Sequence, residues 1–162
     1  MSIDDLEASV PAGYTEDDVK KRIFIGARYD KYYKEKFDQI NPKKPFVGFN
    51  FGAFIFGPMW FLYRKMYAYA SIYVAFIFVI QMVFLIFELN TSGTNGGSIG
   101  LAVAIGILAN GIYKRFVEKK IKFVEDTNVV NVELEIEERG GTDVIAPSLF
   151  IIIVGLLIYL SS

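Results

Sequence analysis

The sequence has no cysteine and no histidine among its 162 residues. Without cysteine, the chain can form no disulfide, offers no thiolate to a metal and has no thiol nucleophile. Without histidine, it lacks the commonest general base, the usual pH-sensitive side chain and the commonest metal ligand. We therefore expect no catalytic residues, no cofactor and no metal site, and we do not expect the protein to be an enzyme.

A large net charge of either sign is also missing. The 17 basic and 18 acidic side chains leave a formal net charge of −1, so no overall field attracts nucleic acid. What the chain has in excess is apolar surface, because 53% of its residues are apolar and 16% are aromatic, with a mean hydropathy of +0.36. The length supports at most one compact unit. Together these values favour an integral membrane protein.

The N-terminal part is polar. Its acidic start lacks the apolar core of a signal peptide, and we interpret residues 1–14 as a disordered tail. Residues 15–45 are predicted to be a cytoplasmic amphipathic segment of two short helices. The first begins at a hydroxyl N-cap, Thr15, and stops at Gly26, and the second covers residues 28–40. The apolar face of the second helix consists of Tyr29, Tyr33, Phe37 and Ile40. That face is expected to dock on the membrane surface or on the rest of the chain.

The remainder, residues 46–160, is the predicted membrane domain. Three apolar runs there are predicted to cross the bilayer, at residues 67–88, 98–116 and 144–160; at about 1.5 Å per residue, about 20 residues match the roughly 30 Å hydrocarbon core. Residues 117–143 are interpreted as a cytoplasmic extension of the second helix followed by an acidic loop. Part of that loop fits either a strand or a helix, and helix or loop is favoured because a lone strand is not stable.

Basic residues next to the apolar runs indicate the topology. Lys43 and Lys44 precede residues 46–63, and Arg64 and Lys65 follow them. The loop at 89–98 has no basic residue. This places the N-terminus in the cytoplasm and the C-terminus outside. Residues 46–63 then begin and end on the same side, as an interfacial or re-entrant helix that Pro58 kinks. The alternative is a fourth crossing. The expected fold is an all-α membrane protein with short cytoplasmic N-terminal helices, one interfacial or re-entrant helix and three transmembrane helices.

Small and polar residues in the second span form a stripe with a spacing of four. Its members are Ser98, Ala102, Gly106 and Asn110. Such a stripe favours a helix–helix contact, and a channel lining is the alternative. Gln81 is the strongly polar side chain in the middle of the first span, where it is expected to bond a neighbouring helix.

Two further candidates lie at the ends of the aromatic stretch between residues 49 and 67. Asn50 is expected to cap a helix over residues 51–56, or else to line a polar path. Arg64 and Lys65 are interpreted as topology anchors, with binding of anionic lipid headgroups or of a partner's acidic segment as the alternative.

This aromatic stretch resembles the signature FN-x-x-AF-x-FGP-x-W-x-x-YRKMY of a bacterial integral-membrane family that is catalogued only as a domain of unknown function. The motif residues that we single out are Phe49, Asn50, Gly57, Pro58, Trp60, Tyr63, Arg64, Lys65 and Tyr67. Phe24-Ile25-Gly26 and Gly140-Gly141-Thr142 are similar to two other pieces of the family pattern. The resemblance implies a multi-pass protein of the bacterial inner membrane. It implies no reaction, ligand or catalytic residue.

The absence of a catalytic set and the small-residue stripe favour a non-enzymatic accessory or scaffold subunit of a membrane assembly. Its expected partners are the lipid bilayer, other membrane subunits or further copies of itself, and anionic headgroups, but not nucleic acid. The alternative is a homo-oligomeric channel or small-molecule permease, although no ionisable residue lies in the middle of a predicted span. A membrane-bound enzyme would have to work through Asp, Glu, Lys, Tyr or Ser.

Overall fold

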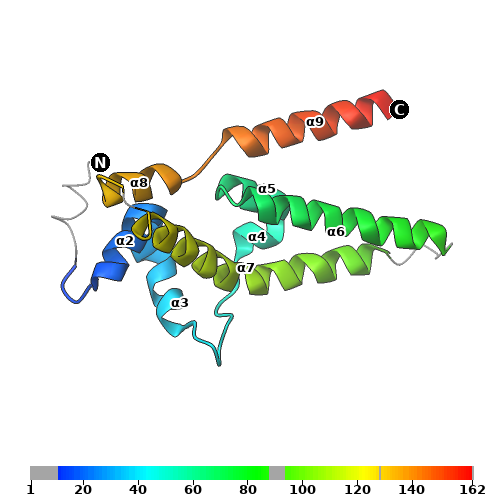
Figure 1. The fold of residues 1–162 in the computed structure, drawn as a ribbon. Coiled ribbons are helices and arrows are strands. Elements are labelled where there is room, and N and C mark those ends of the chain that lie inside the picture. Colours follow the sequence, from blue (N-terminus) through cyan, green and yellow to red (C-terminus); the bar gives the residue numbers. More distant parts are fainter. Residues whose placement is uncertain (1–10, 88–93, 128, 162) are drawn as a thin grey trace. The chain divides into compact units, whose positions relative to one another are not determined.

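The computed structural model describes residues 11–87, 94–127 and 129–161. Over these ranges the ordered elements are helices, with one isolated bridge between Asn41 and Lys44 and no strand (Figure 1). The helices belong to two compact units rather than to the single unit expected from the length. Unit 1 comprises Met1–Phe49 and Leu108–Gly141, and unit 2 comprises Asn50–Ile107 and Thr142–Ser162. Residues 1–10 of the predicted tail and 89–93 of the predicted loop lie outside the described residues, and residues 94–98 of that loop are instead the start of a helix.

Unit 1 begins with helix α2. Its bounds are Glu16–Ile25, and Thr15 is its N-cap, with a capping box in which the Thr15 and Asp18 side chains each accept from the other's backbone N–H. Gly26 ends the helix with φ +79°, a conformation that suits glycine. Both predicted boundaries are therefore confirmed, because both depend on a local side-chain or backbone property.

The second predicted helix of unit 1 has two parts. A π-helical stretch, η1 (Tyr29–Tyr33), leads directly into α3 (Lys34–Gln39). Its predicted apolar face is buried: Tyr29, Tyr33 and Phe37 are at most 2% exposed. Each ring of this size stabilises a fold by about 1.5–3 kcal/mol when it is buried.

This aromatic face docks on α7 (Thr94–Glu125). The centroid of the Tyr33 ring lies 5.0 Å from that of Tyr113, and the centroid of Phe37 lies 6.2 Å from it. Farther along α7, a row of side chains at helical spacing is buried to within 3% exposure; the row is Tyr113, Val117, Ile121 and Val124. The sequence left two docking surfaces open for the aromatic face, the membrane surface and the rest of the chain. The structure shows the face packed on the rest of the chain. The predicted helical extension of the second span is also confirmed.

Helix α8 (Val132–Arg139) completes unit 1 and resolves the ambiguous acidic stretch as a helix. It packs beside α2 (Figure 1). The contact is between backbones, because the Gly141 N–H donates to the Phe24 carbonyl over 2.7 Å. A Cβ on Gly140 would lie only 2.2 Å from the same oxygen. Phe24 and the pair Gly140-Gly141, which are far apart in the sequence, thus meet in unit 1.

Unit 2 begins with two short helices, α4 (Phe51–Phe56) and α5 (Pro58–Tyr63). The single interfacial helix predicted for residues 46–63 is therefore wrong in detail. The chain breaks at Gly57, which has φ +49°, and Pro58 is the first residue of the next helix, where proline is well tolerated. The proline starts a helix here and does not kink one.

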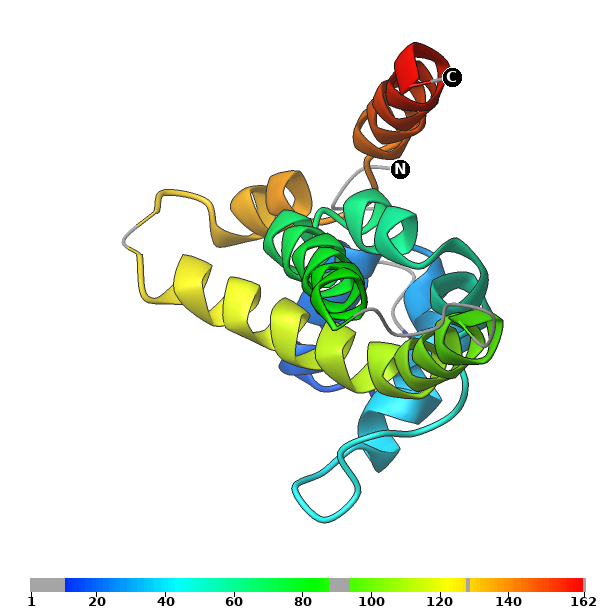
Figure 2. The same cartoon turned by 90° about the vertical axis from the view of Figure 1, so that its right-hand side faces the viewer.

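Two helices are long and apolar enough to cross a membrane by length and composition: α6 (Tyr67–Ile86), and Ile99–Glu125 within α7. Helix α9 (Ile145–Ser161) has 17 residues, or about 25 Å, and falls below that length. The described structure thus supports two of the three predicted spans. Figures 1 and 2 show α9 diverging from α6, and every residue from Ile151 to Ser161 is exposed.

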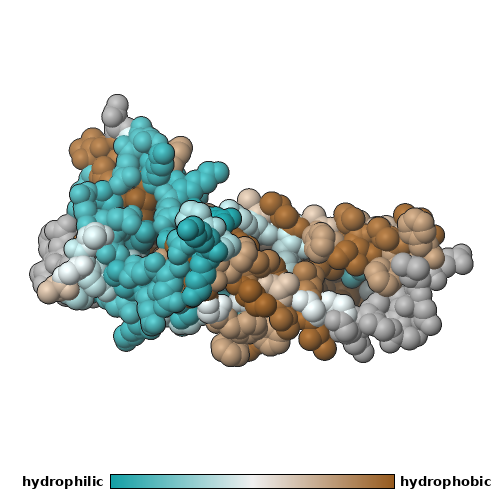
Figure 3. Space-filling model, turned by 90° about the horizontal axis from the view of Figure 1, so that it is seen from below, coloured by the Kyte–Doolittle hydropathy of each residue, from teal (hydrophilic) through white to brown (hydrophobic). Residues whose placement is uncertain are grey.

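The two units have different surfaces. On the face that Figure 3 shows, unit 1 is mostly hydrophilic and the coloured part of unit 2 is mostly hydrophobic. In unit 2, large apolar side chains on α6 and α9 are well exposed, among them Ile72 at 67%, Leu85 at 71% and Ile158 at 63%. Unit 1 therefore has the surface of a water-exposed domain, and unit 2 has a surface that water disfavours.

Candidate functional site

The candidate site is the signature stretch from Phe49 to Tyr67, and its first fixed point is Asn50. The Asn50 side chain is 3% exposed, and its Oδ1 accepts a hydrogen bond from the Ala53 N–H over 3.0 Å. The predicted cap of α4 is thereby confirmed. The Asn50 N–H donates to the Gly106 carbonyl over 2.8 Å, so α4 begins against the backbone of α7.

Glycines allow the chain to reverse direction between α4 and α5. Gly52 leaves room for the indole of Trp60, whose Cδ1 would lie 3.0 Å from a Cβ at that position. Gly57 makes the reversal with its positive φ, and the nearest side chain to it is Tyr73 of α6. The signature residues Gly57, Pro58 and Trp60 thus build one tight turn.

Helix α5 returns antiparallel to the start of α6. The Phe61 ring stacks on that of Tyr69, with centroids 6.4 Å apart and an interplanar angle of 14°. Because Gly57 lies at Tyr73 and Phe61 lies at Tyr69, the α4–α5 reversal is about 9 Å along α6 from Tyr67. The signature therefore forms a short hairpin of helices along the first part of α6.

The basic pair between α5 and α6 is a tight structural turn. Arg64 is only 2% exposed, and its Cζ lies 5.7 Å from the centroid of the Tyr63 ring. Lys65 has φ +57°, which costs a non-glycine residue about 1–2 kcal/mol, and the Met66 N–H closes the turn on the Phe61 carbonyl over 2.9 Å. A buried guanidinium does not fit a headgroup-binding role for Arg64, whereas Lys65 is half-buried.

Asp143 joins this hairpin to α9 and was not among the residues singled out from the sequence. Its N–H donates to the Tyr63 carbonyl over 2.9 Å, and its Oδ2 accepts from the Tyr67 hydroxyl over 2.7 Å. Its Oδ1 caps α9 by accepting from the N–H groups of Ile145, over 2.7 Å, and Ala146, over 3.2 Å. The hydrogen bond from Tyr67, followed by those from the α9 backbone, lowers the pKa of the Asp143 carboxyl. An Asp just before an apolar run is a helix-start pattern that would have identified it.

The predicted small-residue stripe on α7 has an unexpected neighbour. In unit 2, Gly106 is buried and receives the Asn50 N–H. In unit 1, Asn110 is fully buried and its Nδ2 donates to the Val47 carbonyl over 3.0 Å. At both positions a hydrogen bond joins α7 to the non-helical segment that leads into α4. The helix–helix contact along the stripe stays a prediction. Ala102 is half-buried, and the side chain of Ser98 lies outside the described residues.

The strongest electrostatic cluster in unit 1 surrounds Asp18. The Tyr29 hydroxyl donates to Oδ1 over 2.7 Å, the Thr15 hydroxyl donates to Oδ2 over 2.8 Å, and Lys34 Nζ lies 3.2 Å from Oδ1. Burial alone would raise the pKa of the Asp18 carboxyl, but the hydrogen bonds from Tyr29, Thr15 and Lys34 outweigh it and hold the pKa well below its ordinary value. For Tyr29, burial and then the bond to Asp18 raise the pKa of the phenol.

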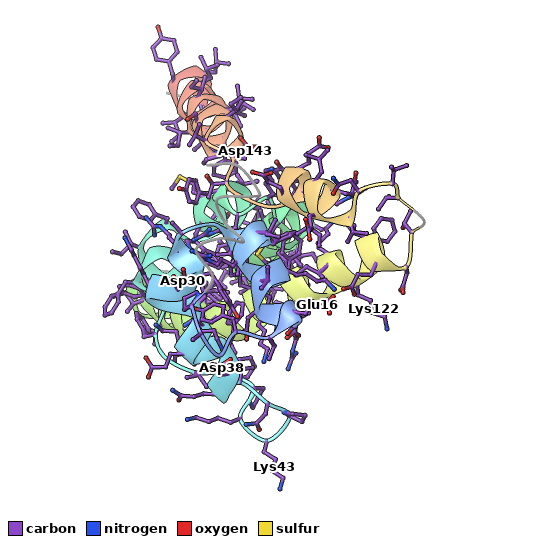
Figure 4. The ribbon with its side chains drawn as sticks, turned by 90° about the vertical axis from the view of Figure 1, so that its left-hand side faces the viewer. Glu16, Asp30, Asp38, Lys43, Lys122 and Asp143 are labelled. Carbon is purple, nitrogen blue, oxygen red and sulfur yellow. The ribbon has the colours of Figure 1, made fainter. Side chains whose placement is uncertain are left out.

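The Asp18 cluster closes the first turn of α2 onto η1, which makes it a structural element. Within the described ranges, no group of three or more acidic side chains is placed to hold a metal ion. Figure 4 shows the labelled acidic residues on separate elements, with Glu16 on α2, Asp38 on α3 and Asp143 before α9.

Comparison with known families gives one finding. A family model described as "Protein of unknown function (DUF2628)" matches residues 16–119, which is more than half of the chain. The match includes the whole signature hairpin and stops before Gly140-Gly141-Thr142. Comparisons with curated proteins and with solved structures gave no match. The chain therefore belongs to the DUF2628 family of proteins of unknown function.

Proposed function

We propose that this chain is an integral membrane protein that serves as a non-enzymatic accessory or scaffold subunit of a membrane assembly. The observation that carries the proposal is the exposure of α6. The core helix of a soluble protein is mostly buried. In contrast, only 6% of the apolar 18-residue stretch of α6 is buried within the chain. A helix this apolar needs lipid or other membrane helices around it.

We further propose that α6, the apolar part of α7, and α9 are three spans, in the inner membrane of a bacterium. Helices α4 and α5 have six residues each, or about 9 Å of length, which is too short to cross roughly 30 Å of hydrocarbon. Their reversal at Gly57 supports an interfacial or re-entrant hairpin. In this topology the N-terminus is cytoplasmic and the C-terminus is outside, and a slightly short α9 is accommodated by local thinning of the bilayer.

The polar residues of the signature region favour a scaffold over a channel. A channel would use Asn50 and Asn110 to line a pore. Both side chains are instead buried and bonded to backbone atoms, Asn50 at the start of α4 and Asn110 at Val47. Their amides thus stabilise the entry of the chain into the hairpin.

The test is the mass and composition of the particle extracted from its own membrane in mild detergent. A second polypeptide at a fixed ratio is the expected result. A closed ring of this chain alone would instead support the channel or permease, and flux measurements in liposomes with Asn50→Ala, Gln81→Ala and Asn110→Ala would follow. A particle containing a single copy and no partner contradicts the accessory role.

A further inference from the structure

The basic side chains of unit 1 fall into two groups. In the first group they hold the fold together: Lys114 Nζ donates to the carbonyls of Phe37 and Ile40, over 2.6 and 2.9 Å, and so caps the end of α3. Lys20 pairs with Glu125 in a similar structural role, at 2.7 Å. The second group is exposed and has no described partner among the residues that the structure covers. It contains Lys43, Lys44, Arg115, Lys119 and Lys122, together with Arg28 and Lys31 just before and within η1.

The first two members of this second group are presented by a closed turn. The N–H groups of Asn41 and Lys44 donate to each other's carbonyls, over 3.1 and 3.0 Å. The Asn41 side chain also accepts from the Lys43 N–H over 3.0 Å. Pro42 and Pro45, inside and just after the turn, restrict it further. In Figure 4 Lys43 projects from this turn away from the helices, and both lysines are exposed.

The same turn rests on α7. A Cβ on Gly111 would lie 2.3 Å from the Pro45 carbonyl oxygen and 2.8 Å from the Phe46 ring, so the base of the turn touches the helix there. Arg115, Lys119 and Lys122 follow Gly111 by 4, 8 and 11 residues and therefore lie on the same side of the helix. We call Lys43, Lys44, Arg115, Lys119 and Lys122 the basic face.

Two observations support treating these five residues as one exposed face: the position of the buried row on α7 and the pairing of the nearby Glu118. The buried row on α7, which includes Tyr113 and Val117, points into the core of unit 1, roughly opposite the cations. Glu118 lies near the basic face along the helix, but its carboxylate pairs with Lys21 at 3.2 Å and with Lys114 at 3.7 Å. It therefore neutralises structural cations.

We propose that the basic face binds the anionic phospholipid headgroups of the bilayer that α7 enters, an inference that rests on the membrane location under the proposed function. The apolar run of α7 ends at Tyr113, and Arg115 lies about 3 Å beyond it along the helix. Lys119 lies about 6 Å farther, which is comparable to the roughly 5–8 Å thickness of one headgroup layer. Long basic side chains reach across such distances. Phe46, exposed by 37% beside the turn, adds an apolar contact at the same level.

The position of the cations decides between a lipid and a protein partner. They begin where an uncharged run on the same helix ends, and that is where a negatively charged leaflet attracts basic segments. An acidic protein segment needs no such proximity to an apolar run. The observations therefore favour the lipid, and an acidic protein becomes an outcome of the test.

The experiment uses the purified full chain in mild detergent, titrated separately with phosphatidylglycerol, phosphatidylcholine, inorganic phosphate and a polyglutamate peptide. Binding is measured as the shift of the thermal midpoint. The main variant carries Lys43→Gln, Lys44→Gln, Arg115→Gln and Lys119→Gln, and two double variants divide the same changes in case the fourfold variant unfolds. Arg28→Gln with Lys31→Gln is the charge-matched control for each double variant, because both residues are exposed, Arg28 just before η1 and Lys31 within it.

We expect phosphatidylglycerol, and not phosphatidylcholine, to stabilise the wild type and the control. The fourfold variant should bind phosphatidylglycerol at least about tenfold more weakly, each double variant should be intermediate, and added salt should weaken binding to the wild type. Equal phosphatidylglycerol binding by wild type and fourfold variant overturns the inference. So does an equal shift with inorganic phosphate, or a shift confined to polyglutamate.

The proposed membrane location is checked separately in the same preparations. Alkaline carbonate should leave the wild type and every variant in the membrane fraction. Release of the wild type would refute the membrane location itself. Retention of all variants without any lipid discrimination would refute the basic face alone.

Discussion

Tyr67 and Asp143 lie 76 residues apart in the sequence and share a hydrogen bond of 2.7 Å between the tyrosine Oη and the aspartate Oδ2. The bond joins the first residue of α6 to the residue that caps α9. Tyr67→Phe removes the bond and keeps the ring, so we expect the thermal midpoint to fall by about 2–4 °C. Asp143→Ala should lower it further because the cap of α9 is lost as well, and Asp143→Asn, which can still cap, should fall between the two. Equal midpoints for Asp143→Ala and Tyr67→Phe would show that the cap contributes nothing.

The Asp18 cluster predicts how stability depends on pH. Because the pKa of Asp18 in the fold is lowered, its contribution is fully present above its unfolded value, near 4. That contribution is lost as the pH falls below this value toward the folded pKa. Asp18→Asn should therefore be less stable than the wild type at pH 7, with a flatter loss of stability between about pH 5 and pH 3.

Tyr29→Phe provides the companion measurement for the same cluster. It removes the hydroxyl that donates to the Asp18 carboxylate while keeping the buried ring. Because the folded pKa of Asp18 then moves closer to its unfolded value, the acid-induced loss of stability should be smaller than in the wild type and should end at a higher pH. Thermal midpoints measured across the pH series check both variants, and an unchanged profile for Asp18→Asn would assign the acid sensitivity to a different carboxyl.

The backbone contact between α2 and α8 predicts a sensitive glycine. Gly140→Ala places a Cβ 2.2 Å from the Phe24 carbonyl oxygen, and this backbone atom cannot rotate out of the way. We expect unit 1 to lose about 1–3 kcal/mol of stability, together with faster proteolysis between α7 and α8. Gly155→Ala is the control, because no atom lies within 4 Å of its Cβ position and alanine favours a helix. A wild-type midpoint for Gly140→Ala would mean that α8 does not dock on α2 in solution.

Two asparagine caps offer a matched comparison. Asn50 caps α4 and Asn131 caps α8, each with an Oδ1–N distance of 3.0 Å, but Asn50 is buried and Asn131 is exposed. Asn50→Ala should cost about 1–2 kcal/mol, at the upper end for a cap, because water cannot replace the lost acceptor. Asn131→Ala should cost about 0.5–1 kcal/mol. Equal costs, measured by denaturant unfolding, would rule out burial as the source of the difference.

Topology around the signature hairpin can be tested with single cysteines, because the natural chain has none. Lys44→Cys and Lys65→Cys bracket α4 and α5. If the hairpin returns to the side from which it entered, an impermeant thiol reagent should label both positions from the same side of sealed vesicles. Labelling of the two cysteines from opposite sides would refute the interfacial or re-entrant arrangement and support a fourth crossing.

The features that the sequence predicted well depend on residues close to one another in the chain. Thr15 and Asn50 were identified as caps because a cap bonds a backbone N–H two or three residues away. The buried faces of η1–α3 and of the end of α7 were visible in the spacing of apolar residues. The all-helical class follows from the same local patterns.

The features that were missed depend on contacts between distant segments. Nothing near Lys114 in the sequence indicates that it caps the end of α3, 74 residues earlier, and a charge at the end of a span is more simply interpreted as an anchor. Arg64 was interpreted as a topology anchor for the same reason, and its burial was not foreseen. The break was attributed to Pro58 because a proline inside an apolar run usually kinks a helix. In the structure the break lies at Gly57, whose φ is positive, and Pro58 begins the next helix.

Unit 1 is assembled from two parts of the chain that are separated by the hairpin, α6 and the first part of α7. Ribosomes make residues in order, so Tyr33 and Phe37 exist well before their neighbour Tyr113. At about 5–20 residues per second, that interval lasts roughly 4–15 s. During it, two aromatic rings destined for a core have no place to bury. In the proposed topology, the helices between these two parts enter the bilayer before unit 1 is complete.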